Sequence, residues 1–136
     1  MNDNVTDNVT DNTSATDGSK RILLVCRHAP YGTSLARESI ETALAAGALG
    51  VDITLLFIND GVWQLYNHQQ VSVIAAKNHG AMLSALPLYG VERLLVDEKS
   101  LSERGIKASN LTDIAEVIDK DQVKHLLANC KVILSF

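Results

Sequence analysis

Short apolar runs alternate with helix-patterned segments along most of this chain. Four of these runs lie at residues 21–27, 51–58, 91–96 and 132–136. Each is nearly continuous, as a strand that is buried on both faces requires. Between the first two runs, Ala36, Ile40 and Ala43 recur at helical spacing, with Gly47 or Gly50 available to end the helix. This alternation favours a parallel sheet over an all-helical or all-strand fold.

Residues 114–118 can be read as a short strand or as the start of a long final helix. Asp119 and Gln122 resemble a capping box with Asp in place of Ser or Thr, which starts the helix after Asp119. Residues 114–118 are therefore predicted to be a strand, which brings the number of strands to five. The fold class predicted is α/β, a three-layer α/β/α sandwich on a five-stranded, mainly parallel sheet.

Functional sites of such sheets lie where loops leave the carboxyl ends of the strands. Three segments of the chain meet that condition, namely residues 26–33, 59–61 and 96–99. We expect any site of this chain to be built from these segments.

The formal net charge of −4 is concentrated at the amino terminus. Residues 1–19 hold four aspartates and no Lys or Arg, and the remaining twelve acids balance twelve bases. With few large apolar residues, residues 1–19 are predicted to be a disordered acidic tail. Residues 20–136 are predicted to form a single α/β domain, and their neutral balance argues against direct nucleic acid binding.

The chain carries two cysteines, Cys26 and Cys130, which are too few for a disulfide scaffold. Its amino terminus lacks the basic and apolar regions of a signal peptide. No apolar run approaches the roughly 18 residues of a spanning helix. We expect a cytoplasmic protein that does not interact with membranes.

The loop that follows the first strand contains Pro30, Tyr31, Gly32 and Thr33. Free backbone N–H groups at the start of the next helix could hold an anion there. The loop has neither a Walker pattern nor the dinucleotide-binding glycine pattern. It is thus a candidate anion-binding loop, and the alternative is an ordinary turn between strand and helix.

Cys26 is a candidate reactive thiol because it lies beside Arg27 and His28, and cations lower the pKa of a thiol. Alternation along a strand points neighbours to opposite faces, however, so core packing is the favoured interpretation. The four histidines show no metal-ligand spacing, and neither a metal nor a cofactor is expected.

Trp63 and Tyr66 follow the second strand within one short segment. An aromatic pair at a sheet end is typical of a partner-binding anchor. Aromatic residues fill cores equally often, so the pair is a candidate interface with core packing as the alternative.

Several motifs together resemble the DsrE/DsrF/DsrH group of small sulfur-relay proteins, and most closely its TusC (DsrF) branch. They run in order from Arg21 to Phe136 and exclude the acidic tail. The motifs are the first strand with Ala29-Pro-Tyr-Gly-Thr33, Phe57-Ile-Asn-Asp-Gly-Val-Trp-Gln-Leu65, Leu88-Tyr-Gly-Val-Glu92, Ser100-Leu-Ser-Glu-Arg-Gly105 and Val132-Ile-Leu-Ser-Phe136.

The resemblance implies an α/β/α sandwich and a subunit of a heterohexamer with TusB-like and TusD-like chains. Such a complex passes persulfide sulfur to a TusE-like acceptor, toward 2-thiolation of the wobble uridine of tRNA. In sulfur-oxidising relatives the same kind of chain serves dissimilatory sulfur metabolism. The resemblance predicts that the purified chain either self-associates or recruits its TusB-like and TusD-like partners.

One departure from the TusD-like pattern bears on chemistry. In those chains the sulfur-bearing cysteine ends the third strand, and counting back from Gly105 that position falls on Asp97. A persulfide forms on a thiolate and not on a carboxylate. The resemblance thus implies a non-catalytic subunit. Two alternatives remain, a thiol enzyme that uses Cys26 and a small anion- or nucleotide-binding module.

Overall fold

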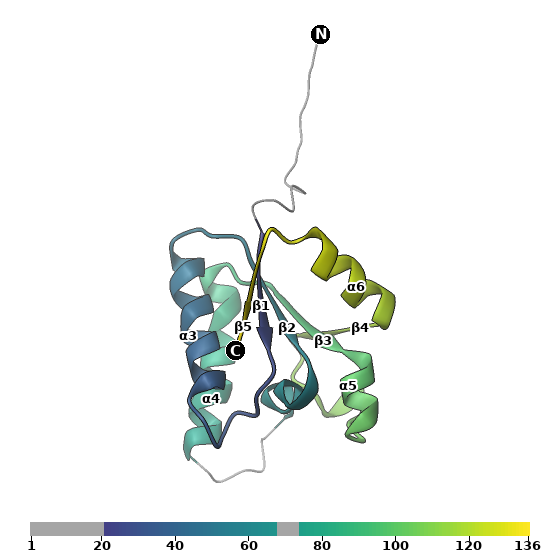
Figure 1. Cartoon of the computed structure of the whole chain (residues 1–136). Coiled ribbons are helices and arrows are strands. Elements are labelled where there is room, and N and C mark those ends of the chain that lie inside the picture. Colours follow the sequence, from purple (N-terminus) through teal and green to yellow (C-terminus); the bar gives the residue numbers. More distant parts are fainter. Residues whose placement is uncertain (1–20, 68–73) are drawn as a thin grey trace.

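The computed structural model describes residues 21–67 and 74–136, and the predicted acidic tail lies outside these residues. Strands and helices alternate along the described chain (Figure 1). In chain order the elements are β1 (Ile22–Cys26), α3 (Leu35–Ala48), β2 (Ile53–Phe57), η3 (Asn59–Leu65), α4 (Ile74–Ala85), η4 (Leu86–Tyr89), β3 (Arg93–Asp97), α5 (Glu98–Glu103), η5 (Ala108–Asn110), β4 (Ala115–Ile118), α6 (Lys120–Asn129) and β5 (Val132–Ser135). In this part of the chain, no helix combines the length and apolar character needed to cross a bilayer.

The five strands form one sheet in the order β4-β3-β2-β1-β5, and every ladder in it is parallel. Leu24, Leu55 and Leu94 lie side by side in adjacent strands. The predicted five-stranded sheet is confirmed, including the strand placed at residues 114–118. Because four connections each return the chain to the same end of the sheet, the loops after β1, β2 and β3 all leave the sheet at one end, which is called here its carboxyl edge.

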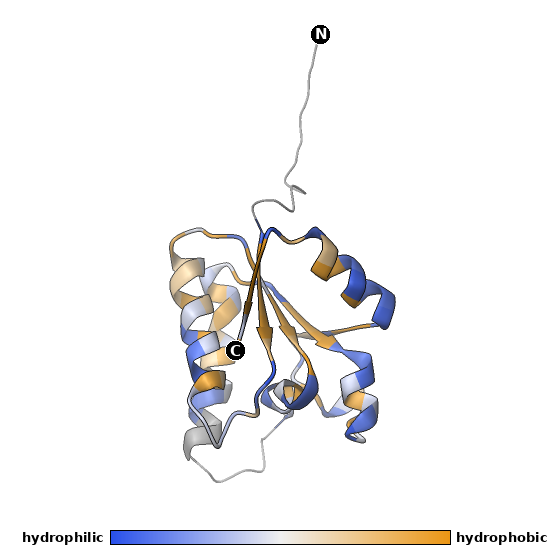
Figure 2. Cartoon of the chain, viewed as in Figure 1, coloured by the Kyte–Doolittle hydropathy of each residue, from blue (hydrophilic) through white to orange (hydrophobic). Residues whose placement is uncertain are grey.

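Both faces of the sheet are apolar, which explains why the strands read as continuous runs (Figure 2). On one face, Leu24, Leu55 and Phe57 pack with residues of α3 and η3 in the larger core cluster. On the other face, Leu23 and Leu56 pack with Leu126 of α6 in a smaller cluster. The result is the expected three-layer α/β/α sandwich.

Several element boundaries follow from local chemistry. Asp119 caps α6, since its carboxylate accepts from Gln122 N while the Gln122 side chain accepts from Asp119 N, as predicted. The segment after β2 was predicted to be a loop at residues 59–61, but the chain turns there directly into the 3₁₀ helix η3. The helix α5 begins at Glu98, directly after β3, because Asp97 caps it.

Candidate functional site

The loops after β1, β2 and β3 are joined to one another at the carboxyl edge of the sheet. Ile58 N donates a hydrogen bond to the carbonyl of Cys26 over 3.1 Å. Asn59 N donates to Ser100 Oγ over 2.8 Å, which connects the end of β2 to α5. The three segments singled out in the sequence therefore form one continuous surface.

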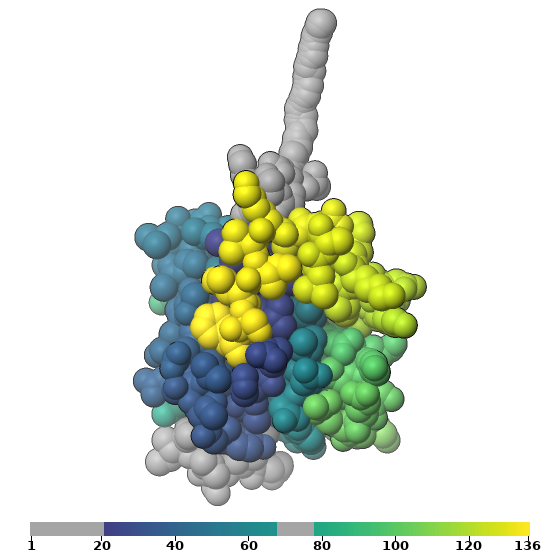
Figure 3. Space-filling model, viewed as in Figure 1, coloured from purple at the N-terminus to yellow at the C-terminus, as the bar shows by residue number. Residues whose placement is uncertain are grey.

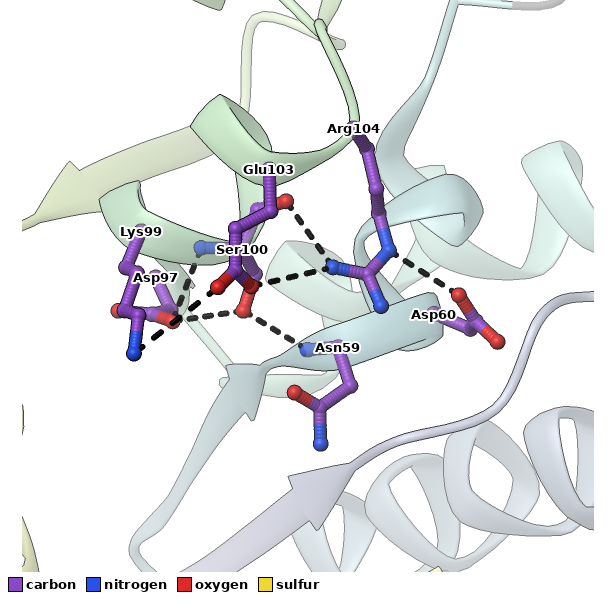
Figure 4. A network of polar contacts seen from close by, with 7 residues as sticks. All are labelled: Asn59, Asp60, Asp97, Lys99, Ser100, Glu103 and Arg104. Atoms are coloured by element: carbon purple, nitrogen blue, oxygen red, sulfur yellow. Dashed lines mark hydrogen bonds and ion pairs between the residues drawn. The ribbon is translucent and has the colours of Figure 1, made fainter.

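Asp97 is held at the centre of this surface by α5 (Figure 4). It is the last residue of β3 and the N-cap of α5. Its Oδ2 accepts hydrogen bonds from Ser100 N at 3.1 Å and from Ser100 Oγ at 2.6 Å. A carboxylate at this position satisfies the first N–H groups of the helix and complements its dipole. The side chain of Asp97 is thereby engaged in structure.

Ser100 connects the two loops that meet here. It is only 2% exposed, and its hydroxyl donates to Asp97 while accepting from Asn59 N. Asn59 adopts a left-handed backbone conformation with φ of 51°, which turns its N–H toward α5 (Figure 4). Asn is one of the few residues that tolerate this conformation well. The hydrogen-bond chain Asn59–Ser100–Asp97 thus fixes β2 against β3.

Arg104 closes the outer side of the same network (Figure 4). Its Nε donates to Asp60 Oδ1 at 3.0 Å, and its Nη1 donates to the carbonyl of Ser100 at 3.2 Å. Glu103 also lies within 3.7 Å of Arg104 Nη1. Asp60 is largely exposed, so this ion pair adds orientation more than stability. The network offers hydrogen bonds and paired charges, and it contains no thiol.

The thiol of Cys26 is buried beneath this edge at 1% exposure. Sγ lies 3.6 Å from Ser39 Oγ and faces the larger core cluster. Burial raises the pKa of Cys26 from 9.0 to about 12, and the hydrogen bond between Cys26 and Ser39 offsets this only in part. Because the folded pKa is raised, the stability that this neutral thiol contributes is fully present below pH 9.0 and is lost as the pH rises toward about 12.

Iodoacetamide at pH 8 is expected to label Cys26 at least about a hundredfold more slowly than Cys130 in the folded protein, because thiolate and access are both needed. Burial also raises the pKa of Cys130, but this thiol is only partly buried. Mass spectrometry of tryptic peptides gives both rates, and urea-unfolded protein is the control in which they become similar. Comparable labelling of both thiols in the folded chain would restore the thiol-enzyme alternative.

The candidate anion-binding loop borders a cleft of about 620 Å³. Pro30, Gly32 and Thr33 line one side of this cleft, and α4 lines the other through residues that include Asn78 and His79. Ser34, the N-cap of α3, donates its hydroxyl to Glu38 instead of capping the helix. A carboxylate thus stands near the start of α3, and Tyr31 is 62% exposed beside the cleft. Anion binding by this loop stays a prediction.

Two linked hydrogen bonds connect that loop to η3 and α4. His79 Nε2 is 2.9 Å from Gln64 Oε1, and Gln64 Nε2 donates to the carbonyl of His28 at 2.9 Å. Since the Gln64 amide donates to a carbonyl, its oxygen faces His79, and His79 Nε2 is the donor. These hydrogen bonds tie α4, η3 and the loop together.

Trp63 and Tyr66 lie half-buried along η3. Their ring centroids are 5.6 Å apart at an interplanar angle of 55°, and both rings pack against the larger core cluster. Their proposed role as an interface stays a prediction. Among the described residues, no group of three or more His, Cys, Asp or Glu side chains could hold a metal ion.

Three polar residues at the carboxyl edge, Ser100, Gln64 and Arg104, were not predicted as site residues from the sequence. Ser100 and Asp97 form an Asp-x-x-Ser pair that the capping rule could have identified, just as it identified Asp119. Gln64 and Arg104 bond to groups distant in sequence, and no local pattern marks them.

Comparison with known proteins places these features in context. The sequence pattern described as the DsrE/DsrF-like family matches residues 20–136. A protein named TusC homolog from Vibrio parahaemolyticus is 39% identical over 110 residues, which cover 81% of this chain and 93% of that protein. Protein TusC from Escherichia coli O127:H6 is 37% identical over 118 residues, which cover 86% of this chain and 99% of that protein.

A solved structure supports the same fold. The crystal structure of ychN protein from E. coli superposes with a TM-score of 0.74 over 86% of this chain and 99% of that chain. Its sequence is 23% identical, so this likeness concerns the fold alone.

Proposed function

Since this chain belongs to the DsrE/DsrF-like family and most resembles its TusC branch, we propose that it is a non-catalytic subunit of a cytoplasmic sulfur-relay complex. In this proposal TusB-like and TusD-like chains are its partners in a heterohexamer. A cysteine of a partner carries the persulfide sulfur to a TusE-like acceptor, toward 2-thiolation of tRNA. The chain contributes its surface and rigidity and does not itself carry sulfur.

The observation that supports this role is that the Asp97 side chain serves as the cap of α5. At the position where TusD-like chains have their cysteine, a carboxylate caps α5 and accepts two hydrogen bonds from Ser100. Sulfane sulfur needs a thiolate, and neither cysteine of the chain replaces it there. Cys26 lies in the core, while Cys130 lies at the far end of α6, next to the start of β5.

The experiment is co-expression of the tagged chain with the TusB-like and TusD-like chains of the same genome. The wild-type chain and a Cys26→Ala/Cys130→Ala variant are expected to recover both partners equally. Both complexes are expected to transfer labelled sulfur from a persulfide donor to the TusE-like acceptor at rates within about twofold, because no thiol of this chain takes part. The 2-thiouridine content of tRNA in a deletion strain then reports the pathway.

Recovery of the chain without partners would contradict the role as a subunit. An assembled cysteine-free complex that transfers sulfur about tenfold more slowly would contradict the non-catalytic role. The thermal midpoint of the variant is measured in parallel, since truncation of a buried Cys26 costs some stability.

A further inference from the structure

The strand β5 differs from the other strands in its exposure. Val132, Ile133 and Leu134 are 41%, 44% and 42% exposed, whereas the apolar residues of β2 are all buried. Figure 3 shows the carboxy-terminal residues at the molecular surface beside α3. Because side chains alternate along a strand, these three residues expose apolar area on both faces of β5.

Both faces of β5 are open. Ile133 lies in register with Leu23, on the side of the sheet that α6 covers, and Leu134 lies in register with Leu24, on the side of α3. Neither core cluster includes a residue of β5. Since β5 pairs only with β1 and ends the sheet, its outer row of backbone N–H and C=O groups has no strand partner among the described residues.

The opposite edge of the sheet is protected, which makes the exposure of β5 informative. In the middle of β4, Glu116 is exposed and lies 3.9 Å from Arg93 of β3. A charged residue in the middle of an edge strand discourages another strand from adding to it. Val132–Ser135 contains no charged residue. A charged residue therefore protects the β4 edge against the addition of another strand, and the β5 edge has no such residue.

The charges near β5 define what would fit it. Lys131 precedes the strand, and Arg27 stands at its other end, where its Nε donates to Ser135 Oγ at 2.8 Å. Neither β5 nor β1 contains a carboxylate. A second copy that paired antiparallel about a two-fold axis would bring Lys131 toward Arg27 of that copy, which is unfavourable. A strand with carboxylates at its ends would be complementary.

The geometry points to β5 as the docking edge for an extended acidic strand from a sibling subunit, which continues the sheet beyond β5. The identity of the sibling subunit rests on the proposed function, whereas the acidic character of its strand is inferred from the exposure and the charges of β5. Backbone hydrogen bonds would supply affinity, and the two flanking cations would select against basic strands.

The first test introduces a charge into the edge. Ile133→Glu in the full chain is expected to lower recovery of the co-expressed TusB-like and TusD-like chains by about tenfold or more, because a charge in the middle of an edge strand blocks pairing and this carboxylate also repels an acidic strand. The matched control is Leu88→Glu, which alters an 86%-exposed leucine in η4 and is expected to leave recovery unchanged. Urea midpoints establish that both variants fold.

The second test needs no variant and no partner. Two blocked peptides, Glu-Val-Thr-Val-Thr-Glu and Lys-Val-Thr-Val-Thr-Lys, are added to the wild-type chain, and amide hydrogen exchange is followed by NMR. The acidic peptide is expected to slow exchange at residues 133–135 by about tenfold, and about 1 M salt is expected to weaken the effect. The basic peptide is expected to have little effect.

The outcomes separate the two proposals. If Ile133→Glu recovers the siblings as well as the wild-type chain does, the docking edge is wrong while the proposed function stands. If the wild-type chain recovers no sibling, the proposed function fails, and the peptide experiment alone tests whether β5 binds an acidic strand in preference to a basic one. Equal slowing of amide exchange by both peptides would show that β5 does not select strands by charge, and would overturn the proposed acidic partner. A wild-type dimer that Ile133→Glu dissociates would show that a second copy occupies the edge, and would overturn the acidic partner.

Discussion

Gly61→Ala is expected to destabilise the protein by about 3 kcal/mol or more, the largest effect of a Gly→Ala substitution among the described glycines. A Cβ at Gly61 would lie 1.9 Å from the carbonyl oxygen and 2.7 Å from the carbonyl carbon of Cys26. Both atoms are backbone, at the junction where Ile58 N bonds to the same carbonyl. The substitution therefore has to push η3 away from the end of β1.

Urea unfolding of the full chain measures this loss as a lower midpoint. The matched control is Gly80→Ala in α4, where an added Cβ meets no atom within 4 Å. Alanine is a better helix former than glycine, so this control is expected to gain about 0.5–1 kcal/mol. A Gly61→Ala midpoint close to that of the wild type would mean that η3 does not approach β1 so closely.

Ser100→Ala is expected to lower the free energy of unfolding by about 2 kcal/mol, because it leaves two polar groups without their buried partner. One is Asn59 N, which donates to the serine hydroxyl, and the other is the Asp97 carboxylate, which accepts from it. Hydrogen bonds to a charged group are worth more than neutral ones, so the loss should exceed that of an ordinary serine.

Ser102→Ala tests whether the effect is specific. Ser102 is exposed on the same short helix, and its replacement is expected to change stability by no more than about 0.5 kcal/mol. Two-dimensional NMR of Ser100→Ala should also show faster exchange at the Asn59 amide. Equal urea midpoints for the two variants would show that the Asn59–Ser100–Asp97 chain contributes little to holding β2 and β3 together.

Much of the fold could be predicted from the sequence, because strands buried on both faces leave continuous apolar runs. The capping pair Asp119 and Gln122 even settled whether residues 114–118 are strand or helix. Segments 59–61 and 97–99 were harder to predict because their conformation depends on a neighbour. Asn59 adopts its left-handed turn against Ser100, and α5 begins directly after β3 because the Asp97 side chain accepts a hydrogen bond from the Ser100 amide.

The candidate site was predictable in location and less so in content. The carboxyl ends of parallel strands had to share an edge, which located Asp97 and Cys26 correctly in the topology. Which side chains would bond there depended on distances between segments, as in the pairing of Arg104 with Asp60. The buried link between Gln64 and His79 joins two elements and has no sequence periodicity that would reveal it.

The place of β1 in the sheet has a consequence for how the protein is made. The first described strand pairs with the last one, so the β1–β5 ladder closes a loop that contains nearly the whole domain. Such a long-range pairing bears a large loop-closure entropy and forms late in folding. During synthesis β5 leaves the ribosome after the other described strands, and until then β1 is itself an open edge. In a nascent chain of this protein, the ladder between β1 and β5 therefore forms only after the other strands of the sheet have been synthesised.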